Sequence, residues 1–211
     1  KVDRALEKEL PYAFHPKWGY LTACPTNLGT GMRASSMLHL PGLVLSDQIG
    51  QVLKGIAKLW LAVRGLYSEG TESLGHLYQI SNQSTLGESE EDILARLSKV
   101  IGDVARYESQ AREKLMTDDP LMVQDHIGRA TGILTYARII ASKEALTHLS
   151  MLRLGANLGV MPGELVETCD RLFMETQPAH LHWDAGSKLE PDARDIMRAQ
   201  MIRDQLRSAL P

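Results

Sequence analysis

Hydrophobic positions in the first part of the chain form short runs that are typical of strands. Four such runs contain β-branched or aromatic residues and are bounded by Gly, Pro, Asn or Ser. These predicted strands cover residues 18–23, 34–40, 60–63 and 77–81. Between the second and third runs, over residues 45–59, apolar side chains recur at intervals of three and four, which predicts an amphipathic helix.

The pattern changes at Ser89. Asp92 follows it three residues later, as in a helix-capping pair, and apolar residues at helical spacing continue to about Met116. Pro120 disfavours helical backbone at Asp119, and the acidic residues before it favour a turn. We therefore predict a long helix that ends near a boundary between two units, residues 1–118 and 119–211.

The second unit shows no alternating strand pattern. Ser142 stands where a cap would precede a helix, Pro162 suits the first turn of another, and Pro191 suits the start of a last helix that runs to about Ala209. The second unit is predicted to be entirely helical, so the expected fold class is α+β.

Composition narrows the possible functions. The chain has 211 residues, of which 44% are hydrophobic and 23% charged, as in globular proteins. It contains no apolar run of about 18 residues, so no membrane span is expected. The net charge of -3 argues against a general nucleic-acid binder. Cys24 and Cys169 fit neither a metal spacing nor a disulfide framework, which points to the reducing cytoplasm.

A glycine-rich stretch between the first two predicted strands carries the first candidate residues. Cys24 follows a strand, where a loop can expose it, and Arg33 is the nearest cation that could favour its thiolate. A buried structural cysteine is the alternative. Gly29-Thr30-Gly31 matches no phosphate-binding loop and could be only a turn.

A second candidate segment follows the third predicted strand. Arg64 could bind phosphate as a forked donor, and Glu69 could hold a cationic substrate. The alternative is a solvated loop with an internal ion pair. His180 and His182 lie near Asp184, but a third metal ligand at firm spacing is lacking, so a polar loop is favoured there and no metal site is predicted.

Three segments, in the same order along the chain, resemble the carboxyl-terminal half of the phosphagen (guanidino) kinase catalytic domain. They read Cys24-Pro-Thr-Asn-Leu-Gly-Thr-Gly-Met-Arg-Ala-Ser, Arg64-Gly-Leu-Tyr-Ser-Glu and Ile80-Ser-Asn-Gln. The similarity continues through Ser142-Lys-Glu-Ala and Arg153-Leu-Gly. It is therefore greatest to the bacterial protein-arginine kinase branch and covers nearly the whole chain, whereas arginine and creatine kinases end soon after the catalytic domain.

The resemblance implies an antiparallel sheet flanked by helices that transfers the γ-phosphoryl group of ATP to a guanidinium nitrogen, with Mg²⁺ bridging the phosphates. Such a transfer depends mainly on alignment and on neutralisation of oxygen charge. Cys24 would orient the guanidinium as a thiolate, and Glu69 would hold it and take up its proton. The implied nucleotide-binding residues are Arg33, Ala34, Ser35, Ser36 and Met37, together with Arg64, Gly65, Leu66, Tyr67, Ser68 and Glu69.

The chain also departs from the family pattern. Tyr67 stands where small-molecule members carry a second loop arginine, and Ser68 stands where Gly is usual. The family's amino-terminal Ser-x-Arg-x-Arg element, a nucleotide-binding histidine, a further arginine and a first substrate carboxylate have no counterpart here. We therefore expect this chain to be a fragment of a kinase that does not phosphorylate arginine by itself.

The last predicted helix carries a further motif. Arg194 and Arg198 share one helix face, with Asp195 three residues before Arg198, and a surface helix with one ion pair would explain this spacing. The motif nevertheless resembles the allosteric phosphoarginine-binding motif of the protein-arginine kinase branch. The residues of this motif are Arg194, Asp195, Ile196, Met197, Arg198 and Ala199.

The resemblance further implies particular partners. These are arginine-bearing protein substrates, phosphoarginine, a second copy of the chain in a homodimer, and a bacterial AAA+ protease system, all in the cytoplasm. Nucleic acid and membranes are not expected partners. Two other functions stay open: a kinase for small guanidino compounds, and a non-catalytic adaptor that binds phosphoarginine.

Overall fold

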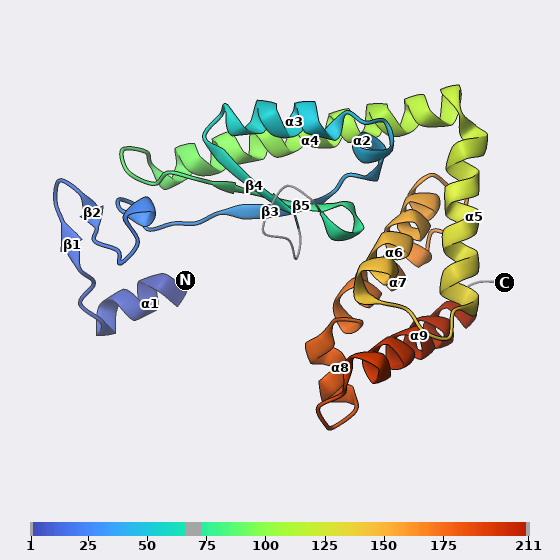
Figure 1. Cartoon of the computed structure of the whole chain (residues 1–211). Helices are drawn as coiled ribbons and strands as arrows, with labels where there is room; N and C mark the ends of the chain where they lie inside the picture. The colour runs from blue at the N-terminus through green and yellow to red at the C-terminus, as the bar shows by residue number, and fades with distance from the viewer. Residues whose placement is uncertain (1, 66–72, 210–211) are drawn as a thin grey trace.

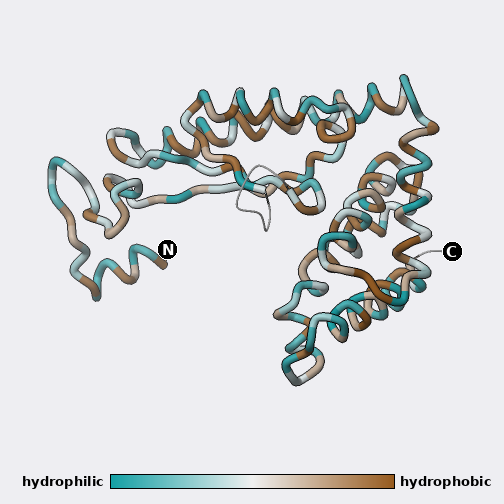
Figure 2. Tube along the Cα trace, in the orientation of Figure 1, coloured by the Kyte–Doolittle hydropathy of each residue, from teal (hydrophilic) through white to brown (hydrophobic). Residues whose placement is uncertain are grey.

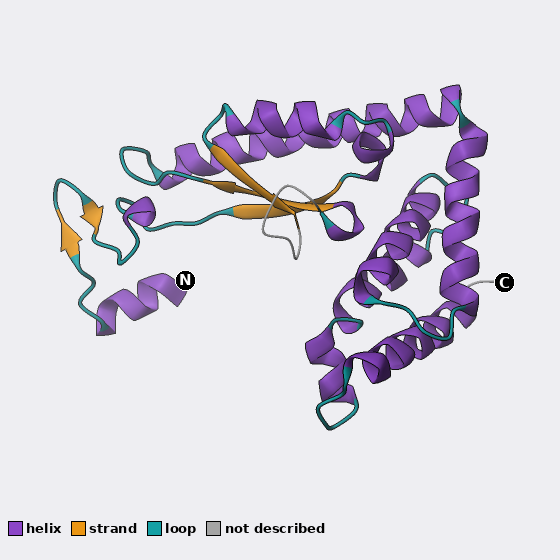
Figure 3. Ribbon diagram, in the orientation of Figure 1, coloured by secondary structure: helices purple, strands orange, loops and turns teal. Residues whose placement is uncertain are grey.

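The computed structural model describes residues 2–65 and 73–209, and this part of the chain combines an antiparallel sheet with many helices (Figures 1 and 3). The predicted α+β class is confirmed. The strands are β1 (Phe14–His15), β2 (Gly19–Tyr20), β3 (Ser35–His39), β4 (Leu61–Gly65) and β5 (Leu77–Asn82). The helices are α1 (Val2–Glu9), α2 (Pro41–Leu45), α3 (Ile49–Ala57), α4 (Glu90–Asp118), α5 (Pro120–Tyr136), α6 (Ser142–Asn157), α7 (Leu165–Glu175), α8 (Pro178–Asp184) and α9 (Pro191–Arg207), with short 3-10 turns η1 (Pro25–Asn27) and η2 (Leu74–His76).

Strands β3, β5 and β4 form the main sheet, with β5 in the centre and both neighbours antiparallel to it. Residues directly opposite one another share a face of such a sheet. Ile80 is fully buried and stands opposite Ser36 and Val63 on the face that α3 and α4 cover (Figure 1). The other face is polar, and it carries the candidate site.

The core of the first unit lies between this sheet and the long helix α4. Buried apolar residues of α4 recur every three, four or seven positions, which places them on one side of the helix. Ser89 caps the helix as predicted, because its hydroxyl accepts the Asp92 N–H at 3.1 Å. The buried apolar residues of this core are Leu40, Leu43, Ile56, Leu61, Tyr78, Ile80, Leu97, Val100, Val104 and Ala111.

Two predicted elements of the first unit are wrong in extent. The helix expected over residues 45–59 is shorter and corresponds to α3. Leu45 is instead the last residue of α2, because Asp47 between the two helices adopts a left-handed φ of 56° that no α-helix can contain. The strand expected over residues 18–23 is reduced to Gly19–Tyr20, which pairs with β1. Soon after it, at Pro25, the chain turns into η1.

Residues 2–30 lie beyond the end of the sheet, away from the carboxyl-terminal helices (Figure 1). Helix α1 buries none of its residues, and the large apolar side chains of Phe14 and Trp18 are exposed. The segment is fastened at η1, where the Thr85 hydroxyl lies 2.7 Å from the Leu28 carbonyl oxygen and 3.2 Å from that of Thr26.

Helices α5 to α9 form the second unit around the central helix α6. Ala145, Leu146, Leu149 and Leu152 of α6 are completely buried and pack with residues of α5, α7 and α9. Hydrophobic and hydrophilic stretches alternate along the long helices in Figure 2, as expected for helices with one buried side. The all-helical prediction agrees with the described residues of this unit.

Two predicted helix starts in the second unit are wrong. Ser142 is already the first residue of α6; Ala141 occupies the cap position and makes no side-chain cap bond. Pro162 lies in the turn before α7, which begins only at Leu165. By contrast, Pro191 opens α9 as predicted.

Asp119 alone separates α4 from α5. Its backbone N–H donates to the Leu115 carbonyl at the end of α4, and its carboxylate accepts the Met122 N–H at the start of α5. With φ at -147° and ψ at 67°, this residue changes the direction of the chain before Pro120. The predicted turn is therefore a single residue long.

Within residues 2–65 and 73–209, no helix combines the length and the hydropathy that a membrane crossing requires.

Candidate functional site

The polar face of the main sheet brings together side chains from all three strands and from the segment before β3. Arg33 is exposed, and its Nη2 donates to Ser81 Oγ at 3.4 Å. Gln79 Nε2 donates to Ser35 Oγ at 2.9 Å. Arg64 is exposed on β4 and lies opposite Gln79 in the strand register. Two guanidinium-bearing residues thus flank a strip of hydroxyl and amide groups, a surface that can receive anionic oxygens through forked donors.

The alternation of β3 divides the predicted residues 33–37 between the two faces of the sheet. Ser35 and Met37 stand opposite Ser81 and Gln79 on the polar face. Ser36 stands opposite Ile80 on the helix-covered face, and Ala34 packs at the margin of the core. The side chains of Ser35 and Met37 can therefore contact a ligand on the polar face, whereas those of Ser36 and Ala34 cannot.

Asn82 fixes the segment that carries Arg33. Its Oδ1 accepts the Ala34 N–H at 2.8 Å, and its Nδ2 donates to the carbonyls of Met32 and Ser84 at 3.0 and 3.2 Å. The side chain is 1% exposed. Sequence reasoning included Asn82 in a motif but gave it no role; a buried amide with both ends engaged is here a structural clamp.

Cys24 is exposed at the residue before η1, so of the two interpretations that the sequence left open, the buried structural cysteine is the wrong one. Its Sγ lies 3.0 Å from Thr26 Oγ1. Hydrogen bonds to the side chain and backbone of Thr26 lower the pKa of Cys24, and the positive charge of Arg33 lowers it by a smaller amount. The sequence identified Arg33 but missed Thr26, although a hydroxyl two residues after a cysteine was the available signal.

Four of the predicted site residues, Leu66, Tyr67, Ser68 and Glu69, lie outside the described residues. Gly65 is the last residue of β4, is buried, and stands opposite Tyr78. Arg33, Arg64 and Cys24, the predicted cations and the predicted thiol, all lie within the described residues.

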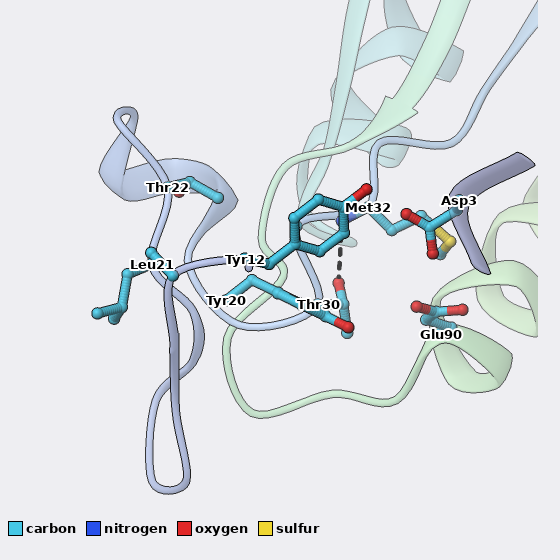
Figure 4. A pocket seen from close by; sticks show the side chains of 10 residues that line it. Asp3, Tyr12, Tyr20, Leu21, Thr22, Thr30, Met32 and Glu90 are labelled. Atoms are coloured by element: carbon cyan, nitrogen blue, oxygen red, sulfur yellow. Dashed lines mark hydrogen bonds between the residues drawn. The ribbon is translucent and has the colours of Figure 1, made fainter. Parts of the chain in front are cut away.

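A hollow adjoins this site on the side of the amino-terminal segment (Figure 4). Met32, next to Arg33, lines it, and the Met32 N–H donates to Thr30 Oγ1 at 3.3 Å. Carboxylates of Asp3 and Glu90 stand at one side, close to Met32 in the view of Figure 4. The lining residues are Asp3, Tyr12, Ala13, Tyr20, Leu21, Thr22, Thr30, Gly31, Met32 and Glu90.

The motif on α9 has one buried and one more accessible arginine. Arg198 is 1% exposed; its Nε donates to the Thr176 carbonyl and its Nη1 to the Ile140 carbonyl, both at 2.9 Å. Arg198 also pairs with Asp195. Arg194 is half-buried near the start of the helix, so the two arginines differ in the access that they give to a ligand.

The other members of the motif follow the same division. Ile196 is half exposed, Met197 is partly buried, and Ala199 is buried in the core of the helical unit. Only one side of the motif thus faces solvent.

The candidate metal residues have a different setting from the one predicted. His180, His182 and Asp184 lie on α8 instead of in a loop, and His182 Nδ1 accepts the Leu189 N–H at 2.8 Å. In the part of the chain that the structure describes, no three His, Cys, Asp or Glu side chains are grouped as metal ligands.

Two family models match the chain in succession. One, described as ATP:guanido phosphotransferase, C-terminal catalytic domain, matches residues 1–111. The other, described as protein-arginine kinase McsB C-terminal domain, matches residues 120–210.

Curated relatives named protein-arginine kinase align along almost the whole chain. That of Syntrophomonas wolfei is 48% identical over 208 residues, covering 99% of this chain and 58% of the relative. That of Moorella thermoacetica is 50% identical over 205 residues, covering 97% and 59%. The chain thus spans about three-fifths of the length of these relatives.

Among solved structures, the duplicated taurocyamine kinase from Schistosoma mansoni is 35% identical to this chain. The similarity covers 52% of this chain and 15% of that one, with a TM-score of 0.45.

Proposed function

Because this chain belongs to the ATP:guanido phosphotransferase family, we propose that it supplies the carboxyl-terminal part of a protein-arginine kinase. The observation that carries the proposal is the polar sheet face, on which Arg33 and Arg64 flank Ser81 and Gln79. Residues 1–118 form the catalytic portion in this proposal, and residues 119–211 form a regulatory unit. The homodimer and the AAA+ protease remain predictions from the family resemblance.

In the proposed reaction, a guanidinium nitrogen of a substrate arginine attacks the γ-phosphorus of ATP. A nitrogen–phosphorus bond forms, the bond from phosphorus to the ADP oxygen breaks, and the nitrogen gives its proton to a base. Arg33 and Arg64 bind phosphate oxygens and neutralise their charge. The Cys24 thiolate orients the positively charged guanidinium, and Glu69 accepts the proton.

The chain's residues suit Mg²⁺ that arrives with ATP more than a metal held by the protein. The polar sheet face offers two cationic guanidinium groups, which attract phosphate oxygens and repel a free metal ion. We propose that Mg²⁺ is bound through the nucleotide, where it neutralises phosphate charge.

The kinase proposal is tested with a chimera in which residues 1–211 replace the matched stretch of the Moorella relative. We expect Mg-ATP-dependent phosphoarginine on an arginine-bearing model protein, detected by mass spectrometry. Arg64→Ala should lower turnover at least about 100-fold, since each aligned donor to developing charge contributes on that order. Arg129→Ala, an exposed arginine on α5, is the matched control and should leave turnover unchanged.

Two results of this experiment would favour other functions. Phosphorylation of free arginine, with none on the protein, would indicate a kinase for small guanidino compounds. An inactive but folded chimera that still binds phosphoarginine would indicate an adaptor. The 211-residue chain measured alone tests the expectation that it is inactive without the rest of the catalytic unit.

We also propose that the α9 motif binds phosphoarginine. Arg194 contacts the phosphate, Asp195 contacts the guanidinium group, and Arg198 holds Asp195 in place from within the core. Phosphoserine lacks the guanidinium group and should bind much more weakly.

Calorimetry on the whole chain with phosphoarginine, arginine and phosphoserine tests this second site. Arg194→Ala should reduce the affinity for phosphoarginine about tenfold or more, because it removes a charge-assisted hydrogen bond. Arg207 is exposed on the same helix, so Arg207→Ala is the control and should leave the affinity unchanged. Equal binding of the two phosphorylated amino acids would show only a basic surface.

A further inference from the structure

A buried hydroxyl joins the sheet to the helical unit. Ser150 of α6 is completely buried, and its Oγ lies 2.7 Å from His39 Nε2 and 2.7 Å from His76 Nδ1. His39 ends β3, two residues after Met37, and His76 ends η2. Three segments that are far apart in the sequence therefore meet at one serine.

The contacts of Arg153 fix the direction of these hydrogen bonds. Its Nη1 lies 3.0 Å from His39 Nδ1, and a guanidinium can only donate, so His39 Nδ1 is an acceptor. The single proton of a neutral His39 is then on Nε2 and is donated to Ser150. Among the described residues, the two imidazoles are the only hydrogen-bond partners of Ser150 Oγ. Because the hydroxyl accepts from His39, it donates its own proton to His76 Nδ1.

Arg153, at one end of this chain of hydrogen bonds, and His39 next to it are held by other groups. Arg153 is anchored on α7 by two bonds to the Asp170 carboxylate, of 2.6 and 3.1 Å. On the sheet side, Arg112 of α4 donates to the His39 backbone carbonyl at 3.3 Å. His39 is therefore held from α4, α6 and, through Arg153, α7.

The backbone of η2 packs closely against α6 and α7 at this junction. Gly75 of η2 has a φ of +65°, and a Cβ there would lie only 3.0 Å from the Leu146 carbonyl oxygen and 3.1 Å from the Phe173 ring. The rings of His39 and Phe173 are also neighbours, with centroids 6.3 Å apart. A backbone this close to α6 keeps the hydrogen-bonding distances short.

Burial favours the neutral forms of both imidazoles. Burial lowers the pKa of His39 well below its usual value, and the nearby Arg153 and Arg112 lower it further. Burial likewise lowers the pKa of His76, to about 4. A protonated His39 would direct an N–H at the Arg153 donor, so the bonding pattern itself requires a neutral ring.

We propose that Arg153, His39, Ser150 and His76 form a positioning relay, in which donors run in one direction and fix the end of β3 on the helical unit. Arg33, Ser35 and Met37 precede His39 on or beside the same strand, so the relay also positions these three residues. That they are positioned for nucleotide binding rests on the proposed function. The relay itself depends only on the geometry of the junction.

Nitrogen NMR of the 211-residue chain with ¹⁵N-labelled histidine tests the relay directly. We expect both His39 and His76 to be neutral Nε2–H tautomers at pH 7. Ser150→Ala should move the ring signals of both residues, whereas Ser150→Thr, which keeps a hydroxyl, should largely restore them. An Nδ1–H tautomer at His39, or ring signals that Ser150→Ala leaves in place, would overturn the proposal.

Hydrogen exchange measures the effect on the strand. Ser150→Ala and Arg153→Met should each speed exchange of the β3 amides about tenfold or more, with α4 amides near Val100 unaffected. Thr147→Ala is the matched control, because its hydroxyl donates to the Lys143 carbonyl within α6. Equal β3 exchange rates in Ser150→Ala and Thr147→Ala would contradict a positioning role.

A third measurement separates this inference from the proposed function. In an active chimera, Ser150→Ala should raise the KM for ATP several-fold with a smaller change in kcat, and Ser150→Thr should restore it. A chimera without activity would refute the kinase proposal and leave the tautomer and exchange results to decide the relay. An unchanged KM beside faster β3 exchange would show that the relay does not serve nucleotide binding.

Discussion

The guanidinium of Arg198 on α9 donates a 2.9 Å hydrogen bond to the backbone carbonyl of Ile140, which lies just before α6. The same side chain reaches the Thr176 carbonyl at the end of α7. One buried cation therefore joins three helices of the second unit through their irregular ends, and it has a structural role separate from that of Arg194.

Arg198→Met should destabilise the chain by roughly 3 kcal/mol, because two carbonyls and the Asp195 carboxylate lose their donor. Urea unfolding of this variant and of Arg207→Ala measures the difference. Arg194→Ala should leave stability within about 0.5 kcal/mol of the parent, as for other changes away from the core. Similar losses in Arg194→Ala and Arg198→Met would contradict the separation of roles.

Glu108 provides a second buried anchor. Its carboxylate accepts the N–H groups of Gly42 and Leu43 at 2.8 and 2.9 Å and pairs with Arg112 at 2.6 Å, although it is only 4% exposed. Glu108→Ala should lower the free energy of unfolding by about 3 kcal/mol, since it orphans two amides and a charge. Thermal unfolding measures this loss, and Glu113→Ala, which changes an exposed residue of α4, is the control. A loss no greater than that of Glu113→Ala would mean that water replaces the carboxylate.

The buried imidazoles predict a pH dependence of stability. An unfolded histidine binds its proton near pH 6.5, whereas folded His76 binds one only near pH 4, and the pKa of His39 is also lowered. Between these values the unfolded chain holds more protons, so stability falls as the pH is lowered. Each imidazole contributes about 1.4 kcal/mol per pH unit in this window.

Urea unfolding of the parent and of His76→Gln between pH 7 and pH 4 measures this contribution. The variant should show a shallower slope by about 1.4 kcal/mol per pH unit. Thr147→Ala removes no titratable group and should keep the parental slope. Identical slopes in the parent and His76→Gln would show that His76 titrates normally in the folded chain.

The two cysteines should differ sharply in reactivity. Cys24 is exposed with a lowered pKa, whereas burial raises the pKa of Cys169 to about 12. Iodoacetamide at pH 7 should therefore label Cys24 at least about tenfold faster than Cys169, as followed by peptide mass spectrometry. Thr26→Val should slow labelling of Cys24 more than Arg33→Gln does. The opposite order would make Arg33 the principal influence on the thiol.

Sequence patterns predicted those features that depend on local spacing. The apolar period and the Ser89 cap defined α4, and Pro191 defined the start of α9. The helix over residues 45–59 was predicted to begin too early, because the left-handed backbone of Asp47 interrupts it and apolar periodicity does not report backbone angles. Spacing also gave no sign that Ala141 would precede α6 without a side-chain cap.

Sequence motifs predicted which residues belong to the candidate site, but they did not predict how those residues are arranged in space. Arg33, Arg64 and Cys24 came from the sequence, but the placing of Arg64 opposite Gln79 and of Ser35 opposite Ser81, the residue that Arg33 contacts, depends on strand register. Ser150 gave no signal at all, because a serine among the apolar residues of α6 acquires meaning only when His39 and His76 come to lie beside it. Long-range hydrogen bonds of this kind have no period along the chain.

The single-residue joint at Asp119 restricts how chain length can vary there. Adding one residue to a helix turns everything beyond it by about 100° and moves it by about 1.5 Å. An insertion that extended α5 at its start would therefore rotate Val123 and Ile127 relative to α4, and with them the face that α5 presents to α6. Insertions and deletions at this joint would therefore change the angular setting of the entire helical unit.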